Sequence, residues 1–139
     1  MKILLVDDDS FLRDMYATKF SELKFDIDVL ETAEGALAKL REQKYDVVLL
    51  DMIMPGITGV ELLKKIKEEG IGGNPICIML SNQSEESDRA AALKAGAVGY
   101  IVKAELIPSE VVASVLNFVS KKIVCLLLII KESSKTLLK

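Results

Sequence analysis

Five short runs rich in Val, Ile and Leu recur along the chain, and this pattern limits its fold more than any other feature. The runs lie at Ile3–Val6, Asp26–Leu30, Asp46–Leu50, Ile76–Leu80 and Val98–Val102. Most of them are continuously apolar, which is typical of strands buried on both faces of a parallel sheet. The second run alternates between polar and apolar residues, so it predicts an edge strand or a half-exposed strand.

Segments with helical spacing separate these runs. They cover Phe11–Leu23, Ala33–Glu42, Gly59–Glu69 and Ser84–Ala95, and a fifth begins at Pro108. Five strands alternating with five helices predict a doubly wound α/β fold in which right-handed crossovers join parallel strands. We expect the flavodoxin-like strand order 2-1-3-4-5, in which the first and third strands flank the reversal of strand order.

Composition narrows the function classes. The chain has 139 residues, enough for one domain, and its net charge of −3 disfavours direct nucleic-acid binding, which normally needs a basic face. It contains no histidine and two cysteines, so the usual zinc sites and any histidine nucleophile are excluded. The N-terminal segment turns acidic after six residues and resembles no signal peptide, so we expect a cytoplasmic protein.

Polar residues follow the expected strands at their carboxyl ends. Asp7 and Asp8 follow the first strand, Asp51 the third, Ser81 the fourth and Lys103 the fifth. Parallel strands end at one edge of the sheet, where ligand sites of open α/β sheets form, so we expect these side chains to meet there.

Three neighbouring carboxylates repel one another, and a bound cation removes that conflict. Oxygen ligands without His or Cys favour Mg²⁺, which leaves room in its coordination shell for phosphate oxygens. Lys103 adds a positive charge to the same place. A carboxylate nucleophile beside two cations is the arrangement that phosphoryl transfer requires.

Four segments together resemble the receiver domain of two-component response regulators, the CheY-like superfamily. They are MKILLVDDDS, VVLLDMIMPGITGVELL, IMLSNQS and AGAVGYIVKAEL, in that order. The resemblance covers Met1–Lys121, so we expect a receiver domain at 1–121 and a C-terminal extension at 122–139. It implies a stand-alone phosphorylation switch rather than an enzyme, with at most slow self-dephosphorylation.

The resemblance also implies roles around the metal. Asp51 is the expected phosphoacceptor, which forms an acyl phosphate with a group taken from the histidine of a sensor kinase or from a phosphotransfer protein. Asp8 is the expected direct ligand of Mg²⁺, and Asp7 holds the ion mainly through water. Ile53 is expected to supply a backbone carbonyl to the metal.

Three further residues are implied in the phosphoryl contact and the switch. Lys103 is expected to contact the phosphoryl group, and Ser81 to supply the hydroxyl that hydrogen-bonds it. Tyr100 matches the switch aromatic, which turns inward when that hydroxyl moves. The expected readout is a reshaped surface on the fourth helix, fifth strand and fifth helix, read by a downstream protein target.

The chain departs from the family pattern at two positions. Ala104 follows the lysine where the family usually has proline, often after a cis bond, so a trans bond or a different loop path is expected here. Asn82 follows the switch hydroxyl where the family usually has a small residue. The larger side chain is expected to slow access to the acyl phosphate.

The run Ile123–Ile130 lies between lysines and extends beyond the expected receiver end. Eight apolar residues are too few for a bilayer, which needs about 20, so we expect no membrane span. The run either extends the last helix or adds a strand, and it needs a partner such as a second copy of the chain. A cloning remnant or a truncated link to another domain are the other interpretations.

Two other functions compete with the switch. A Mg²⁺-dependent phosphohydrolase of the haloacid dehalogenase type also forms an aspartyl phosphate, but it places its nucleophile after the first strand and needs a cap. A pseudo-receiver would be a scaffold that is never phosphorylated, and the complete set of three acids and a lysine argues against it.

Overall fold

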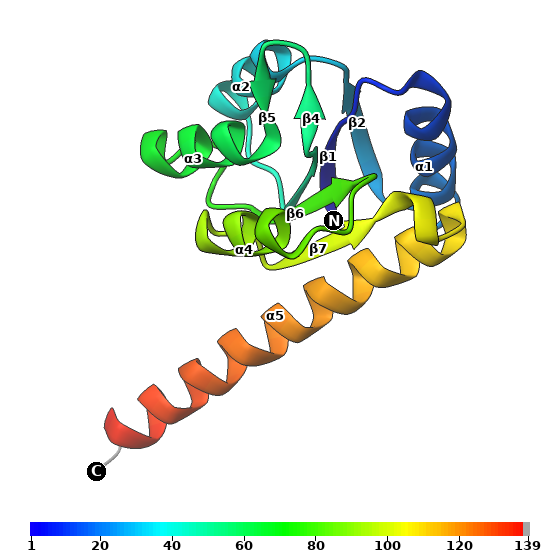
Figure 1. Ribbon diagram of the computed structural model, residues 1–139. Coiled ribbons are helices and arrows are strands. Elements are labelled where there is room, and N and C mark those ends of the chain that lie inside the picture. Colours follow the sequence, from blue (N-terminus) through cyan, green and yellow to red (C-terminus); the bar gives the residue numbers. More distant parts are fainter. Residues whose placement is uncertain (138–139) are drawn as a thin grey trace.

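The protein folds around one five-stranded parallel sheet (Figure 1). The computed structural model describes residues 1–137, with side chains described as far as Glu132. The strands are β1 (Lys2–Val6), β2 (Asp26–Leu30), β3 (Val47–Asp51), β6 (Ile76–Ser81) and β7 (Gly99–Val102). Their order in the sheet is β2-β1-β3-β6-β7, and every neighbouring pair is parallel. This confirms the predicted flavodoxin-like order.

Burial along the strands follows the sequence pattern. All five residues of β3 are buried, as are four of the five in β1, whereas none of the five in β2 is. The difference arises because β2 lies at one edge of the sheet, whereas β3 lies at its centre. The alternating run was therefore correctly predicted as an edge strand.

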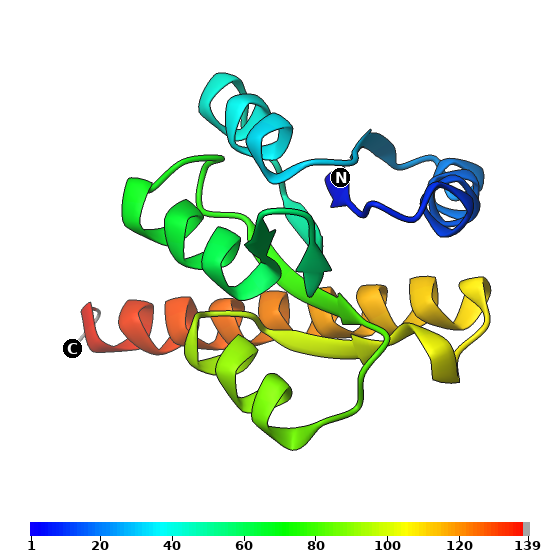
Figure 2. The same cartoon turned by 45° about the horizontal axis from the view of Figure 1, so that its top comes forward.

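Helices cover both faces of the sheet (Figures 1 and 2). The elements are α1 (Ser10–Glu22), α2 (Ala33–Glu42), α3 (Gly59–Glu69), α4 (Glu86–Lys94) and α5 (Pro108–Leu137). Buried residues of α2, α3 and α4 form one hydrophobic cluster with Val48 and Leu50, whereas α1 and α5 pack on Val47 and Leu49. Successive residues of a strand point to opposite faces, so β3 supplies both cores.

Short polar side chains begin three of these helices. Asp9 accepts from the backbone N–H of Leu12 at the start of α1, and Thr32 and Thr58 do the same for α2 and α3. Such caps satisfy backbone donors that have no partner within the helix. In α4, by contrast, the preceding Glu85 makes no side-chain cap, and the helix begins two residues later than the sequence indicated.

Three short elements left no recognisable pattern in the sequence. Strands β4 (Ile53–Met54) and β5 (Ile57–Thr58) form an antiparallel hairpin directly after Asp51, and a single 3-10 turn, η1 (Lys103–Glu105), follows β7. Strands of two residues are too short to show a periodic pattern. The hairpin matters because it holds the loop that follows the predicted phosphoacceptor.

Helix α5 has two halves with different surroundings. Four valines in its first half are buried against the sheet: Val111, Val112, Val115 and Val119. The run Ile123–Ile130 continues the same helix and is exposed throughout, so the strand alternative is wrong. Within the described residues there is one helix, Pro108–Glu132, whose length and composition would allow it to cross a membrane.

The buried first half of α5 stabilises the domain. Removing its four valines from the core would cost about 1.5–3 kcal/mol each, and the sum is comparable to the stability of a whole domain.

Gly59 provides a test of how α3 packs under the site. A Cβ there would collide with the backbone carbonyl of Asp51 and approach the sulfur of Met79 to 2.7 Å. We therefore expect Gly59→Ala to lower the free energy of unfolding by about 2–3 kcal/mol, because the backbone of β3 has no room to move. Urea unfolding measures this. Gly35→Ala in α2 is the control, since its Cβ would meet the Thr32 hydroxyl at 3.1 Å and the Leu30 side chain at an ordinary contact distance of 3.7 Å, and no backbone atom. An equal loss in both variants would contradict the prediction.

Candidate functional site

A cavity of about 370 Å³ opens at the carboxyl edge of the sheet. Its lining comes from the loops after β1, β3, β6 and β7, and consists of Asp8, Asp9, Asp51, Met52, Ile53, Ser81, Asn82 and Lys103. The structure thus brings together side chains from four separate loops, as the strand-end pattern predicted. The cavity lies beside the boundary between β1 and β3, where the strand order reverses.

Three carboxylates form an acidic cluster at this cavity. One oxygen from each of Asp7, Asp8 and Asp51 lies within 4.8 Å of the others. Asp7 is fully buried and Asp51 nearly so, whereas Asp8 is exposed. The two acids after β1 therefore differ in position, since Asp8 lines the cavity whereas Asp7 is buried and is not part of its lining.

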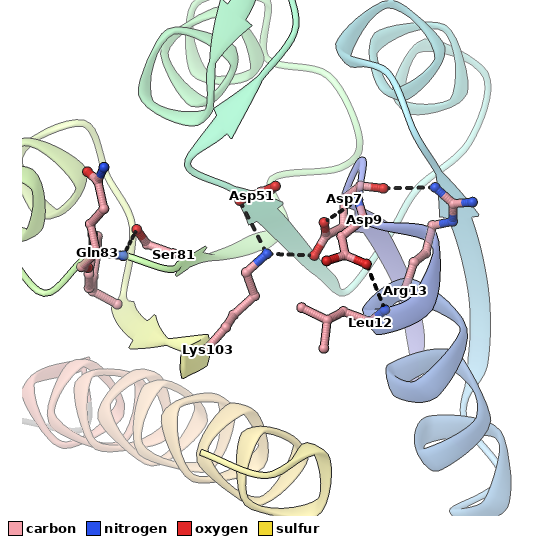
Figure 3. A network of polar contacts seen from close by, with 9 residues as sticks. Asp7, Asp9, Leu12, Arg13, Asp51, Ser81, Gln83 and Lys103 are labelled. Carbon is pink, nitrogen blue, oxygen red and sulfur yellow. Dashed lines mark hydrogen bonds and ion pairs between the residues drawn. The ribbon is translucent and has the colours of Figure 1, made fainter. Parts of the chain in front are cut away.

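Lys103 places a buried ammonium between two of these acids (Figure 3). Its Nζ lies 3.0 Å from Oδ2 of Asp7 and 3.4 Å from Oδ1 of Asp51. The lysine side chain is only 1% exposed, so water screens this contact far less than one at the surface, and each charge depends on the other to offset the cost of its burial. One positive charge faces three carboxylates, so the cluster keeps an excess of negative charge.

The excess negative charge and burial act on Asp51. Burial is the largest cause that raises its pKa, to about 7, and the charge of Asp7 together with a hydrogen bond and the charge of Asp8 acts in the same direction. The Lys103 ammonium opposes this rise. The central carboxylate is therefore poorly compensated by the protein's own groups, and a cation bound next to it would favour its ionised form.

Arg13 holds the loop that carries the acids, and sequence analysis did not single it out. Its Nη1 donates to the backbone carbonyl of Asp7 at 3.0 Å (Figure 3). The same nitrogen lies 3.9 Å from a carboxylate oxygen of Glu31. Asp9 caps the same loop, because its N–H donates to Asp7 Oδ1 and its side chain accepts from Leu12. Arg13 follows the capping residue Asp9 by four residues, about one helical turn, so its side chain lies close to the loop that Asp9 ends.

The backbone of Gln83 links the two predicted switch residues. Its N–H donates to the Ser81 hydroxyl at 3.0 Å, and its carbonyl accepts from the Tyr100 hydroxyl at 2.8 Å. Tyr100 is buried, and the Arg89 guanidinium lies 5.1 Å from its ring centroid. No sequence signal marked Gln83, since it contributes only backbone atoms to both bonds.

The two departures from the family pattern have clear positions. The described residues contain no cis peptide bond, so the bond between Lys103 and Ala104 is trans, as expected for a residue other than proline. Asn82 is exposed and lines the cavity beside Ser81. Ile53 also lines the cavity and is 57% exposed, and the role of its carbonyl stays a prediction.

The donor set suits a hard divalent cation. Carboxylate oxygens close enough to share one ion, with an open cavity beside them, are what Mg²⁺ binds while it keeps several waters. The described residues offer no nitrogen or sulfur ligand in this cluster. Asp7, Asp8 and Asp51 therefore fit Mg²⁺ better than a transition metal.

Comparison with known proteins identifies the family. Residues 3–115 match the family model of the response regulator receiver domain. The chain belongs to the response regulator receiver family. It is 40% identical over 114 residues to the transcriptional regulatory protein ResD of Bacillus subtilis, and 33% identical over 111 residues to the phosphate regulon regulator PhoB of Pseudomonas aeruginosa. These matches cover 82% and 80% of this receiver chain but only 46% and 48% of the relatives, so it spans about half of their length.

Solved receiver structures share the fold. The receiver domain of the Francisella response regulator 1452 has a TM-score of 0.77 and 29% identity, and the match covers 87% of this chain and 98% of that one. The BeF3-activated receiver domain of DrrB has a TM-score of 0.74 and 28% identity, with 86% and 97% covered. The receiver assignment from four sequence segments is thereby confirmed.

The raised pKa of Asp51 predicts a pH-dependent gain from removing its charge. Without divalent cations, Asp51→Asn should raise the free energy of unfolding at pH 8 by on the order of 2 kcal/mol. A carboxyl whose pKa is higher in the folded chain stabilises the fold while protonated, and this contribution is lost as the pH rises through the folded-state value. The gain should therefore shrink as the pH falls from 8 towards 4.

Urea unfolding in EDTA at several pH values measures this difference. The matched control is Asp14→Asn, which neutralises an exposed carboxylate on α1. If Asp51→Asn were no more stable than wild type at pH 8, or if its gain were the same at pH 4, the electrostatic account of the cluster would be wrong.

Proposed function

We propose that this receiver accepts a phosphoryl group on Asp51 from the phosphohistidine of a sensor kinase or phosphotransfer protein. The observation that carries the proposal is the Asp51 carboxylate at a cavity shared with two further acids and a buried ammonium 3.4 Å away. Phosphoryl transfer depends on positioning and charge compensation, and this arrangement supplies both.

The proposed reaction needs little from the protein beyond position and charge. An Asp51 carboxylate oxygen forms the new bond to phosphorus while the bond between phosphorus and the donor's histidine nitrogen breaks. That nitrogen leaves with the bonding electron pair. Lys103 already reaches Asp51 and is placed to contact an oxygen of the transferred group.

We propose that Mg²⁺ is held by Asp7, Asp8 and Asp51, with the backbone carbonyl of Ile53. When bound, the ion supplies positive charge that offsets the carboxylates and the incoming phosphoryl oxygens. The raised pKa of Asp51 supports a role for this cation, because the carboxylate must be ionised near neutral pH to act as the nucleophile and a nearby positive charge favours that form.

Switching would begin at the Ser81 hydroxyl. The hydroxyl oxygen accepts from the N–H of Gln83, while its own O–H can donate to a phosphoryl oxygen on Asp51, so a movement of Ser81 towards that oxygen would also act on Gln83. The carbonyl of that same residue accepts from Tyr100, so a shift of this loop is passed to the aromatic ring and to Arg89 on α4. The surface of α4, β7 and α5 is therefore the proposed readout for a protein target.

We also propose how this receiver passes on its signal. The matched relatives are named as transcriptional regulators, and the chain spans about half of their length. For this receiver we propose a cytoplasmic switch, without a membrane span, that acts by protein contact rather than by direct nucleic-acid binding of its own residues. Its net charge of −3 supports that choice.

Chemical phosphorylation tests the acceptor directly. Incubation with Mg²⁺ and acetyl phosphate should add one labile phosphoryl group to the wild type, measured by intact mass spectrometry. The adduct should be absent in Asp51→Asn and in EDTA, whereas Asp14→Asn should be phosphorylated normally. An adduct that persists in Asp51→Asn would assign the acceptor elsewhere. No adduct in the wild type, together with no binding of the beryllofluoride mimic, would favour a pseudo-receiver.

Asn82 allows the lifetime of the acyl phosphate to be tested. Because it lines the cavity beside Ser81, its truncation should open a path for water to the phosphoryl group. We expect Asn82→Ala to shorten the half-life of phosphorylated protein by about three- to tenfold. Loss of the mass adduct over time gives the rate, and Asn117→Ala, exposed on α5, is the control. An unchanged half-life would show that Asn82 does not limit access.

A further inference from the structure

The second half of α5 presents an apolar surface on every side. All eight residues of Ile123–Ile130 are exposed, and its seven large aliphatic side chains are 46–60% exposed. Successive helical residues are turned by about 100°, so eight of them circle the helix more than twice. Figure 1 shows this part of α5 projecting beyond the sheet. No described part of the chain covers it, and an apolar surface of this kind needs a partner.

A lipid bilayer is a poor match for this segment. Eight helical residues extend about 12 Å, less than half of the roughly 30 Å hydrocarbon core. Lysines bound the segment at both ends: Lys121 and Lys122 before it, Lys131 after it. The preceding part of α5 cannot lengthen it, because Val111, Val112, Val115 and Val119 are held in the core of the domain.

We propose that the segment is a self-association site, covered by the same segment of a second copy in antiparallel orientation. A second copy offers an apolar surface of the same length. A two-fold axis between Leu126 and Leu127 would superpose the two segments completely, since it relates each residue to one on the other copy reciprocally.

The charges at the ends of the segment favour the antiparallel orientation. Lys121 and Glu132 are eleven residues apart and lie on the same side of the helix, and in that register Lys121 of each copy lies opposite Glu132 of the other, which is an attractive combination. Lys122 and Lys131 are nine residues apart, so they lie on opposite sides of the helix and do not meet in one pair. In a parallel pair every one of these residues would face its own copy, and all charges would repel. One pair covers one side of each helix, so two pairs can join through the remaining apolar side.

This contact is separate from phosphoryl chemistry. It lies on the part of α5 that leaves the domain, whereas Asp51 lies at the carboxyl edge of the sheet. Pairing would hold two receivers in one assembly before either is phosphorylated. The inference therefore does not rest on the proposed function, and the two can fail independently.

Light scattering after size exclusion tests the association on the full chain, up to about 100 µM, where micromolar contacts are populated. Wild type should have the mass of a dimer or a tetramer. Leu128→Glu combined with Ile130→Glu places one charge on the side of the helix that carries Lys121 and Glu132 and one on the opposite side. This variant should be monomeric and still be phosphorylated by acetyl phosphate. Leu23→Glu, which charges an equally exposed leucine on the domain, should retain the wild-type mass. A monomeric wild type would overturn the proposal, as would self-association that survives the double substitution.

Disulfide cross-linking tests the orientation. In a Cys125→Ala background the remaining thiol, Cys77, is buried, so introduced cysteines report the contact. A mixture of Lys121→Cys and Glu132→Cys chains should form the mixed disulfide on oxidation, and Lys121→Cys alone should not cross-link. Efficient cross-linking of Lys121→Cys with itself would overturn the antiparallel contact. Flotation of a monomeric chain with anionic phospholipid vesicles would identify a lipid surface as the occupant and would also overturn the proposal.

Discussion

The buried contact between Lys103 and the carboxylates of Asp7 and Asp51 is the interaction on which the rest of the site depends. Among the described side chains, these three and Ser81 are the only buried polar or charged residues, and all four belong to the same edge of the sheet. The rest of the core is apolar on both faces of the sheet. The electrostatic cost of burying charge is thus confined to one place, where a cation or a phosphoryl group can change it.

This concentration of charge explains why one residue is suited to be modified. Asp51 lies between an acidic cluster that raises its pKa and an ammonium that opposes the rise. Small changes in local charge therefore have large effects on this carboxylate. The backbone of Gln83 gives such changes a path outward, because both Ser81 and Tyr100 hydrogen-bond to it.

Helix α5 joins two environments in one element. Its first half is part of the core beneath the sheet, and its second half carries an apolar surface into solvent. Since no break separates the halves, a contact made by the projecting end would be rigidly connected to the face of the receiver that is proposed to signal.

Sequence by itself determined the five strands, the edge strand and the convergence of Asp8, Asp51, Ser81 and Lys103, because parallel strands must end at a common edge and apolar periodicity is local. The strand order came with the flavodoxin-like fold that the chain resembles, and no periodic pattern specifies it. Three features were decided only by the tertiary structure: the pairing of Lys103 with Asp7 as well as Asp51, the Arg13 contact to the acidic loop, and the Gln83 link. Residues 7 and 103 are 96 positions apart, and which oxygen the ammonium reaches depends on loop geometry set by η1 and the β4–β5 hairpin. Those elements are too short to leave a pattern, and Gln83 acts through backbone atoms that every residue shares.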